Sequence, residues 1–473
     1  MKKFDKNKYL KKLKLHRWWQ NYSKYFYIGI PCVLCLVLGI YFAYSKFFVS
    51  VNEDITKTTV GDFIYGDIIV TPYIDGKYSN TFPEKKTGIN FEKVICDNDV
   101  TASWDEDKWG LYTSNLSKRT KCNVYFVTPA SCGINDNVSC ISTREELVTL
   151  ATEVNNGDNK SGNIIYLTND LDLGGKFDSS GNVLDGNISW TPIGTEDNPF
   201  SGTFDGNGHI ISNMYVNRPT ENYNALFGRT QKSYIKNVGI ISSYVIGYRM
   251  QAALIGQGGD DSSASKISNS FSLATINGKY SRSAGLCAVY CNVVNSYNGG
   301  NITNGNEDLT GGILAAWGIV ENSYNYGKVT SSANSVGGIV GWMGSAINTY
   351  NLNTVSAVSN ATGGILGCGD DKSTIINSYN SGKCNYGGVL GYQYGKSSYE
   401  SMTMVFKNNH YVIGNSSYGI YAFKSNLESM PLSESEMPSV LSVINGDNAF
   451  VEDTNNINNG YPILKWQTER ENN

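Results

Sequence analysis

The sequence has 473 residues, too many for one ordinary compact domain, but a solenoid can be this long because each repeat packs only on its neighbours. With 50 Gly, 32 Tyr and only 17% charged residues, it is typical of short strands joined by many tight turns, and long helices fit it poorly. Residues 1–24 contain nine of the 38 basic residues and one of the 42 acidic ones, which leaves 29 basic and 41 acidic side chains in residues 25–473. This acidic remainder argues against nucleic acid as a partner.

Residues 25–44 form an uncharged run of 20 residues, long enough as a helix to span a hydrocarbon core of roughly 30 Å. Aromatic side chains flank both ends of the run, as they do at membrane interfaces. The basic tail 1–24 predicts a cytoplasmic N-terminus and an extracellular location for everything after residue 44. The alternative is a signal peptide cleaved after Ser45. The run exceeds the usual signal-peptide core of roughly 7–15 residues, which favours an uncleaved anchor in the cell membrane.

After a linker at 45–58, residues 59–127 alternate like a small β-domain, for which the sequence suggests no function. Two cysteines, Cys32 and Cys35, lie inside the apolar run, where we interpret them as small membrane side chains. The other eight permit disulfides outside the cell, with Cys96–Cys122 and Cys132–Cys140 as one plausible pairing, and their spacing supports no structural zinc site. These eight are Cys96, Cys122, Cys132, Cys140, Cys287, Cys291, Cys368 and Cys384.

Residues 141–160 predict a short amphipathic helix. Thr143 and Glu146 have the spacing of a capping box, and apolar residues follow at helical intervals. A solenoid end exposes unpaired strand edges, so we expect this helix to cover the N-terminal end. The apolar residues are Leu147, Leu150, Ala151 and Val154.

Two motifs alternate from about residue 205 onward. The first places an Asn two residues before an aromatic residue, at Asn213, Asn269, Asn295, Asn322, Asn348, Asn377 and Asn409, with a degenerate copy at Asn237. The second has a small residue, two apolar residues and another small residue, and begins at Ala225, Ala253, Gly285, Gly312, Gly338, Gly364 and Gly388.

Within one repeat, Ile267, Asn269 and Phe271 share a face, because strand side chains alternate. If each repeat is one coil, like residues stack at about 4.8 Å, the Asn side chains bond to one another and the aromatic rings form a column. We therefore predict an all-β fold, a right-handed parallel β-helix of about ten coils over 161–425. An antiparallel sandwich would explain the turns but not the two-motif period.

Residues 426–466 are predicted to close the C-terminal end. Residues 433–445 suggest a short helix, although Pro438 obscures its start. Residues 459–466 suggest a final turn and strand.

The stretch from Trp190 to Gly228 resembles the entry segment of bacterial surface proteins with GLUG repeats. It contains the motifs WTPIG (190–194) and FSGTFDGNGH (200–209), followed by the first copies of the two repeat motifs. The resemblance covers roughly residues 141–466. It implies a β-helix displayed at the cell surface, as in adhesin-like proteins and beside the catalytic domain of immunoglobulin A1 proteases. It implies no catalytic residue.

No catalytic motif is apparent. The three histidines, His16, His209 and His410, form no zinc-protease motif, and nucleophile-elbow and phosphate-loop motifs are absent, so we expect no catalytic residue, metal or cofactor. The acidic pairs at 260–261 and 370–371 lie four repeats apart, or about 19 Å. That is too far for a glycosidase pair, which needs roughly 5–9.5 Å. Solvated turns are favoured over weak calcium sites.

The candidate binding residues are aromatic side chains that follow the second motif in successive repeats. If the turns align, their rings form a row suited to a sugar or a protein partner, although large aromatic residues are more often buried. They are Tyr290, Trp317, Trp342, Tyr392 and Tyr394. The sequence thus favours a membrane-anchored, non-catalytic scaffold for a glycan or a host or matrix protein. A polysaccharide-acting β-helix enzyme and a passive spacer are the alternatives.

Overall fold

We analysed a computed structural model of the chain. It divides into two compact units, Met1–Ser131 and Cys132–Asn473, which are treated separately below. The predicted tail, anchor and linker at 1–24, 25–44 and 45–58 lie outside the described residues, and within those residues no helix is long and apolar enough to cross a membrane. The structure describes residues 68–74, 77–79, 81–83, 90–97, 102–105, 110–113, 120–127, 137–305, 309–332, 334–445 and 448–470.

In the first unit, four strands form a sheet in the order β2-β1-β6-β3, and two more form a hairpin. A disulfide joins Cys96 to Cys122 across the antiparallel pair of β3 and β6, as the near-neighbour pairing suggested. Phe126, which is fully buried, packs edge-on against Trp104. The strands are β1 (Ile68–Ile74), β2 (Lys77–Tyr78), β3 (Asn90–Cys96), β4 (Ala102–Asp105), β5 (Gly110–Thr113) and β6 (Thr120–Val127).

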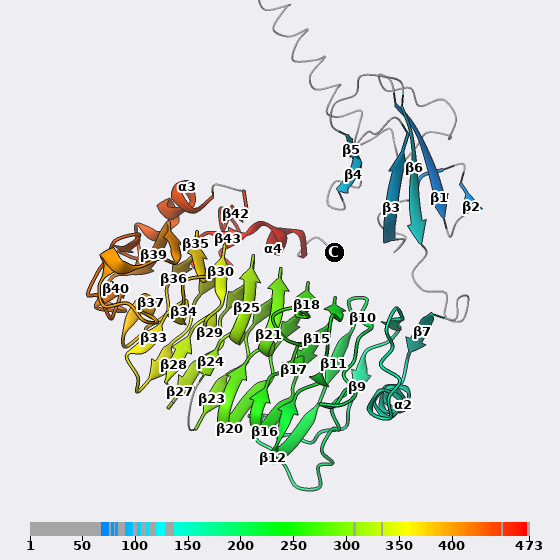
Figure 1. The fold of residues 1–473 in the computed structure, drawn as a ribbon, viewed down its shortest axis with the longest axis horizontal. Coiled ribbons are helices and arrows are strands. Elements are labelled where there is room, and N and C mark those ends of the chain that lie inside the picture. Colours follow the sequence, from blue (N-terminus) through cyan, green and yellow to red (C-terminus); the bar gives the residue numbers. More distant parts are fainter. Residues whose placement is uncertain are drawn as a thin grey trace, which may run out of the picture. The chain divides into compact units, whose positions relative to one another are not determined.

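The second unit is a parallel β-solenoid of about ten turns with little helix, which confirms the predicted all-β class and the parallel coils. In Figure 1 the strands of successive turns lie side by side along the solenoid. One wall is a ten-stranded sheet with one strand from each turn. Its strands are β9 (Leu171–Asp172), β11 (Ile210–Ser212), β15 (Gly239–Ile241), β19 (Phe271–Ser272), β22 (Tyr297–Asn298), β26 (Tyr324–Asn325), β31 (Tyr350–Asn351), β36 (Tyr379–Asn380), β39 (Asn409–Val412) and β41 (Ser429–Leu432).

The other strands form the remaining walls. Those that enter the corner before the ten-stranded sheet are β7 (Val138–Ile141), β8 (Ile164–Leu167), β10 (Thr203–Asp205), β14 (Tyr234–Lys236), β18 (Ser265–Ser268), β30 (Ser345–Ile347), β35 (Thr374–Ile376) and β38 (Val405–Lys407). Those that follow it are β12 (Tyr215–Asn224), β13 (Phe227–Arg229), β16 (Tyr244–Gln251), β17 (Ile255–Gln257), β20 (Thr275–Ala284), β21 (Cys287–Val294), β23 (Ile302–Asn304), β24 (Leu309–Gly311), β25 (Leu314–Glu321), β27 (Val329–Ser331), β28 (Ser335–Gly337), β29 (Val340–Trp342), β32 (Val355–Ala357), β33 (Ala361–Gly363), β34 (Leu366–Gly369), β37 (Gly387–Gln393) and β40 (Tyr418–Ile420). The long strands β21 and β25 continue into the corner before the ten-stranded sheet, where they pair with β18 and β30.

The first motif forms the amide bonds and the aromatic column between coils that its spacing predicts. Every motif Asn except Asn409 adopts the left-handed region at a corner, for example Asn322 at φ 46°, and Asn adopts this region more readily than most residues. The amide of Asn348 donates to that of Asn322 at 3.0 Å, so these side chains bond from coil to coil. Two residues on, aromatic rings stack in a column at 4.8–5.0 Å. This tyrosine column consists of Phe271, Tyr297, Tyr324, Tyr350 and Tyr379.

The predicted alignment fails at both ends of the array. Tyr215 pairs with Tyr244 in β16, outside the tyrosine column, so the Asn213 copy belongs to a different corner. At the other end Tyr379 pairs with His410 rather than Tyr411, because Asn408 makes the left-handed turn in place of Asn409. Coil length varies at both ends, and matching by residue type alone shifted the register there.

The second motif begins and ends with small residues for steric reasons. A Cβ added to Gly367 would lie 2.5 Å from the carbonyl oxygen of Gly341 in the preceding coil and 2.6 Å from the amide nitrogen of Val336. No side chain fits there, because two strands of neighbouring turns pack backbone to backbone. The apolar residues between the small ones, such as Ile365 and Leu366, are fully buried in the main core.

The N-terminal end carries the predicted helix. Helix α2 (Arg144–Asn155) has the capping box of Thr143 and Glu146, and its four predicted apolar residues are buried in the main core. The C-terminal segment behaves differently from the prediction. It contains η3 (Met437–Val440), α3 (Leu441–Ile444), β42 (Phe450–Val451), β43 (Ile463–Leu464) and α4 (Lys465–Arg470).

This C-terminal segment runs back along the ten-stranded wall and covers part of the tyrosine column (Figure 1). Tyr350 and Tyr379 are fully buried beneath it. Tyr350 donates to the Gln467 side chain at 2.7 Å, and the Trp466 indole donates to the Asn322 carbonyl oxygen at 2.7 Å. The segment therefore seals a lateral face of the solenoid, where we had expected it to close the end.

Candidate functional site on the lateral face

Bulky residues occupy left-handed turns on one side of the solenoid. Tyr223, Met250 and Arg282 have φ of 62°, 56° and 59°, and across from them Tyr290 and Trp317 have φ of 60° and 53°. Large side chains rarely adopt this conformation, and where they do the surrounding structure must hold them there. These turns direct aromatic and basic side chains to one lateral surface.

A second hydrophobic cluster, separate from the main core, supports this surface. Tyr290, Trp317 and Trp342 are partly buried and pack against it. The cluster gives large rings a rigid base while leaving part of each accessible. Its buried members are Ala284, Val289, Leu309, Ala315 and Ala316.

The structure places the first two predicted residues together. The rings of Tyr290 and Trp317 stack with centroids 5.0 Å apart and planes 12° apart. Trp342 is one residue out of line: it pairs with Ala316, and Met343 makes the next left-handed turn instead. The predicted row therefore stops at Trp317, although Trp342 contacts the same buried cluster.

The last two predicted residues fall into separate contacts. Tyr394 is 59% exposed and meets Trp342 edge-to-face at 5.7 Å. Tyr392 lies 6.4 Å from Phe423, in the neighbouring coil. The five predicted residues thus fall into a stacked pair, an edge-to-face pair and a fifth ring, Tyr392, which belongs to neither pair.

A second stacked pair, which the sequence did not lead us to predict, lies beside the first. Tyr248 and Tyr280 stack at 4.9 Å in adjacent coils, and the guanidinium of Arg249 lies 4.7 Å from the Tyr280 ring centroid. The guanidinium of Arg282 lies 5.4 Å from the Trp317 centroid. The sequence signal that could have revealed this pair is a Tyr followed one or two residues later by an Arg, just before the second motif. We call Tyr248, Arg249, Tyr280, Arg282, Tyr290 and Trp317 the arginine–aromatic face.

Stacking along the solenoid has a geometric consequence. Because the rings of each pair lie face to face at the coil spacing, they turn their edges outward and hide the faces between them. Burial raises the pKa of the Tyr290 hydroxyl, and the charge of Asp261 raises it further, whereas Arg282 opposes the shift. The face thus offers guanidinium groups and ring edges rather than a flat aromatic platform.

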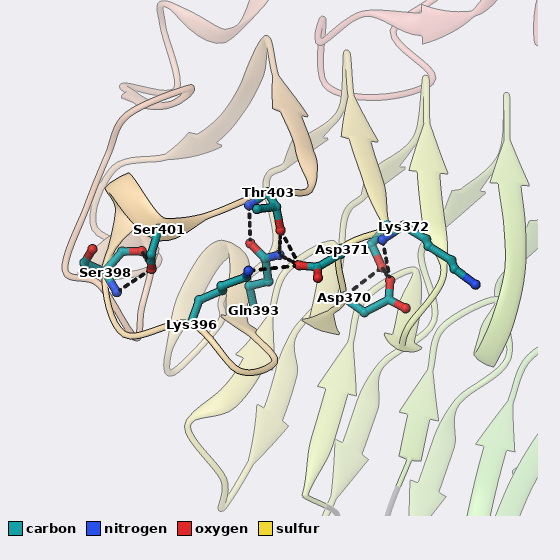
Figure 2. Close-up of polar contacts among 9 residues, drawn as sticks. Asp370, Asp371, Lys372, Gln393, Lys396, Ser398, Ser401 and Thr403 are labelled. Carbon is teal, nitrogen blue, oxygen red and sulfur yellow. Dashed lines mark hydrogen bonds and ion pairs between the residues drawn. The ribbon is translucent and has the colours of Figure 1, made fainter.

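A polar cluster lies farther along the solenoid (Figure 2). The Asp371 carboxylate oxygen Oδ1 accepts from Gln393 at 3.1 Å, from Lys396 at 3.2 Å and from the Thr403 hydroxyl. These bonds, first those with Thr403 and Lys396, hold the pKa of Asp371 below its usual value. Gln393 is fully buried and also bonds Thr403, so the cluster fastens the loop before Thr403 to the coil.

The two acidic turns have a local structural role. Asp260 accepts from the hydroxyls of Ser262 and Ser263, and Asp370 accepts from that of Ser373. Strand pairing places the two turns four coils apart, which corresponds to about 19 Å. Asp260 and Asp370 each close their own turn, whereas Asp371 belongs to the polar cluster described above. In the described part of the chain, no group of three metal-ligating side chains is found.

Comparisons with known proteins give a partial sequence match and a structural match. No family model matches the chain, so the GLUG resemblance remains a prediction. A stretch of 80 residues is 32% identical to a protein of Evansella cellulosilytica described as a "Putative Gly-rich membrane protein". The match covers 17% of this chain and 9% of that protein's length. A solved structure described as "a putative immunoglobulin A1 protease from Bacteroides ovatus" is 18% identical and has a TM-score of 0.46, covering 70% of this chain and 94% of the other.

Proposed function

We propose that the chain is a membrane-anchored bacterial surface protein whose solenoid is a non-catalytic binding or adhesion scaffold. The observation that carries this proposal is the arginine–aromatic face, where bulky side chains are held in left-handed turns over a separate buried cluster. Such conformations persist where the fold enforces them, and they are frequent at binding surfaces. A glycan or a host or matrix protein is the ligand class that this proposal implies.

The location is part of the proposal. The apolar run at 25–44 and the basic tail before it support a single membrane anchor with the bulk of the chain outside the cell. The partial similarity to a protein described as a membrane protein agrees with this. Protease added to intact cells should digest the solenoid and spare residues 1–24, and protection of the solenoid would contradict the orientation.

The binding role is tested with the full-length chain in detergent micelles, applied to a panel of immobilised glycans and matrix proteins. We expect at least one reproducible ligand, whose binding Trp317→Ala weakens at least tenfold. The matched control is Tyr326→Ala, because Tyr326 is 37% exposed and follows β26 on the ten-stranded wall. A panel with no ligand, or equal loss in both variants, would overturn the proposal.

A further inference from the structure

We propose that the arginine–aromatic face recognises acidic polysaccharide, that is, sugar chains bearing carboxylate or sulfate groups, with Arg249 and Arg282 as the anion contacts. This inference rests on the proposed function and narrows its ligand class. It arises from two arginines that the aromatic prediction did not include.

Both guanidinium groups are held in place by rings. Arg249 lies 5.3 Å from the centroid of Tyr248 and 4.7 Å from that of Tyr280, so it contacts both members of one stacked pair. Arg282 stands beside Trp317 in the next coil, at 5.4 Å. Cation–π contacts of this kind fix the orientation of a guanidinium without neutralising its charge.

Neither arginine has a carboxylate partner among the residues that the structure describes. Other arginines of the solenoid do: Arg229 lies 3.8 Å from Glu196, and Arg218 pairs with Glu221. Within the described residues, Arg249 and Arg282 form no ion pair, and the buried Nε of each has no hydrogen-bond partner. A buried donor without a partner is energetically unfavourable. An oxyanion at this face would supply the missing acceptor and the missing charge.

The surroundings favour an acidic sugar over nucleic acid. Single-stranded nucleic acid binds largely by stacking its bases on exposed ring faces. The rings of each pair here hide those faces between them. An acidic polysaccharide places its anionic groups at the two arginines, and its oxygen atoms meet the outward ring edges, which carry the positive part of the ring quadrupole.

The test compares ligands that differ only in charge. The full-length chain in detergent is titrated with polygalacturonate and with its methyl ester, which has the same sugar backbone without the carboxylates. Heparin and a single-stranded oligonucleotide are the sulfate and phosphate arms. We expect polygalacturonate or heparin to bind at least tenfold more tightly than the methyl ester and the oligonucleotide, and to bind more weakly as salt increases.

Variants locate the contacts. Arg249→Gln with Arg282→Gln should weaken the acidic ligand at least tenfold, and the double Lys variant should recover part of the loss. Lys407→Gln, which removes an exposed charge on β38, should have no effect. A thermal melt of each variant identifies any that fails to fold, and then the methyl-ester comparison on the unaltered chain decides.

The two proposals fail in different ways. Equal binding of the methyl ester, tighter binding of the oligonucleotide, or an unaffected double Gln variant overturns the acidic-sugar inference. If Trp317→Ala still abolishes binding of a neutral glycan or matrix protein, the scaffold function stands without it. If no ligand of any class binds, both proposals fall.

Discussion

Asparagine serves two different purposes in each coil. Asn322 and its equivalents turn a corner in the left-handed region, and the sequence repeat revealed them. Asn325, which directly follows an aromatic residue, is fully buried, and its equivalents form an interior ladder in which each amide donates to the next at 2.8–2.9 Å. The Asn residues of this ladder recur in the sequence as regularly as those at the corners. Their burial was not predicted, because a two-residue strand is too short to show the alternation that distinguishes inward-facing from outward-facing residues.

Replacing Asn325 by Ala should strongly destabilise the solenoid. The change removes the acceptor for the Asn298 amide and the donor to Asn351, leaving buried polar groups without partners. We expect the free energy of unfolding to fall by about 2–4 kcal/mol, measured by urea denaturation. Asn301→Ala is the control, since Asn301 is exposed, and should change stability by less than about 1 kcal/mol. Equal effects would contradict the ladder's role.

His410 occupies the place where the tyrosine column would add another ring. It is 3% exposed, neither ring nitrogen has a hydrogen-bond partner among the described residues, and burial lowers its pKa from 6.5 to about 4. Between these pH values the unfolded chain binds a proton that the folded protein excludes. The free energy of unfolding should therefore fall as the pH drops from 6.5 to 4, by up to about 3 kcal/mol.

His410→Phe tests this by removing the titrating group and restoring an aromatic ring. In this variant the free energy of unfolding, measured by urea denaturation, should no longer fall between pH 6.5 and 4. His209→Gln, at the partly exposed histidine next to Asp170, should keep it. If the free energy of unfolding of His410→Phe still falls over this pH range, other titratable groups cause the pH dependence.

At the scale of elements, the sequence located helix α2 and the aromatic column but misplaced the C-terminal segment. The helix was predictable because its capping box and apolar residues are adjacent in sequence. The position of the C-terminal segment depends on contacts such as that of Trp466 with Asn322, which are 144 residues apart. No local pattern records such a contact. The register errors at Asn213 and Asn409 have a related cause, since coil length changes there.

Trp466→Ala should loosen the C-terminal segment. Its indole lies 5.9 Å from the Tyr324 ring and bonds the Asn322 carbonyl oxygen. We expect docking of the segment to weaken by about 2 kcal/mol, so that limited proteolysis cleaves it roughly 30-fold faster. Lys465→Ala, at an exposed neighbour, should leave the cleavage rate unchanged. Unchanged cleavage in Trp466→Ala would show that the segment is held by other contacts.

For the whole molecule, the period of the two motifs was enough to predict a parallel solenoid, because only stacked coils explain alternating motifs over this length. The candidate face was predicted only in part. Tyr290 and Trp317 occupy equivalent positions in successive repeats, so their stacking followed from the alignment. Arg249 and Arg282 meet aromatic rings of the next coil at non-equivalent positions, which a comparison of repeats does not bring together.

A solenoid also limits how far a disturbance spreads, because each coil contacts only its neighbours. Leu147→Ala leaves a cavity under α2, and we expect hydrogen exchange to accelerate in β8 and β10 while β29 and β34 keep their rates. Val148→Ala, at a residue 39% exposed on the same helix, should change neither region. A uniform rise along the chain would indicate that the solenoid unfolds as one unit.

The C-terminal segment also bears on how such a chain can change length in evolution. Its residues Trp466, Gln467 and Asn458 bond, in that order, to Asn322, Tyr350 and Tyr379 of successive coils. A gene duplication that added a coil between residues 322 and 379 would displace one set of partners by about 4.8 Å and leave the segment mismatched. In the part of the chain that the structure describes, the ring contacts of the segment with the tyrosine column start at Tyr297. Natural length variants should therefore gain and lose coils in the first half of the solenoid and keep the second half constant.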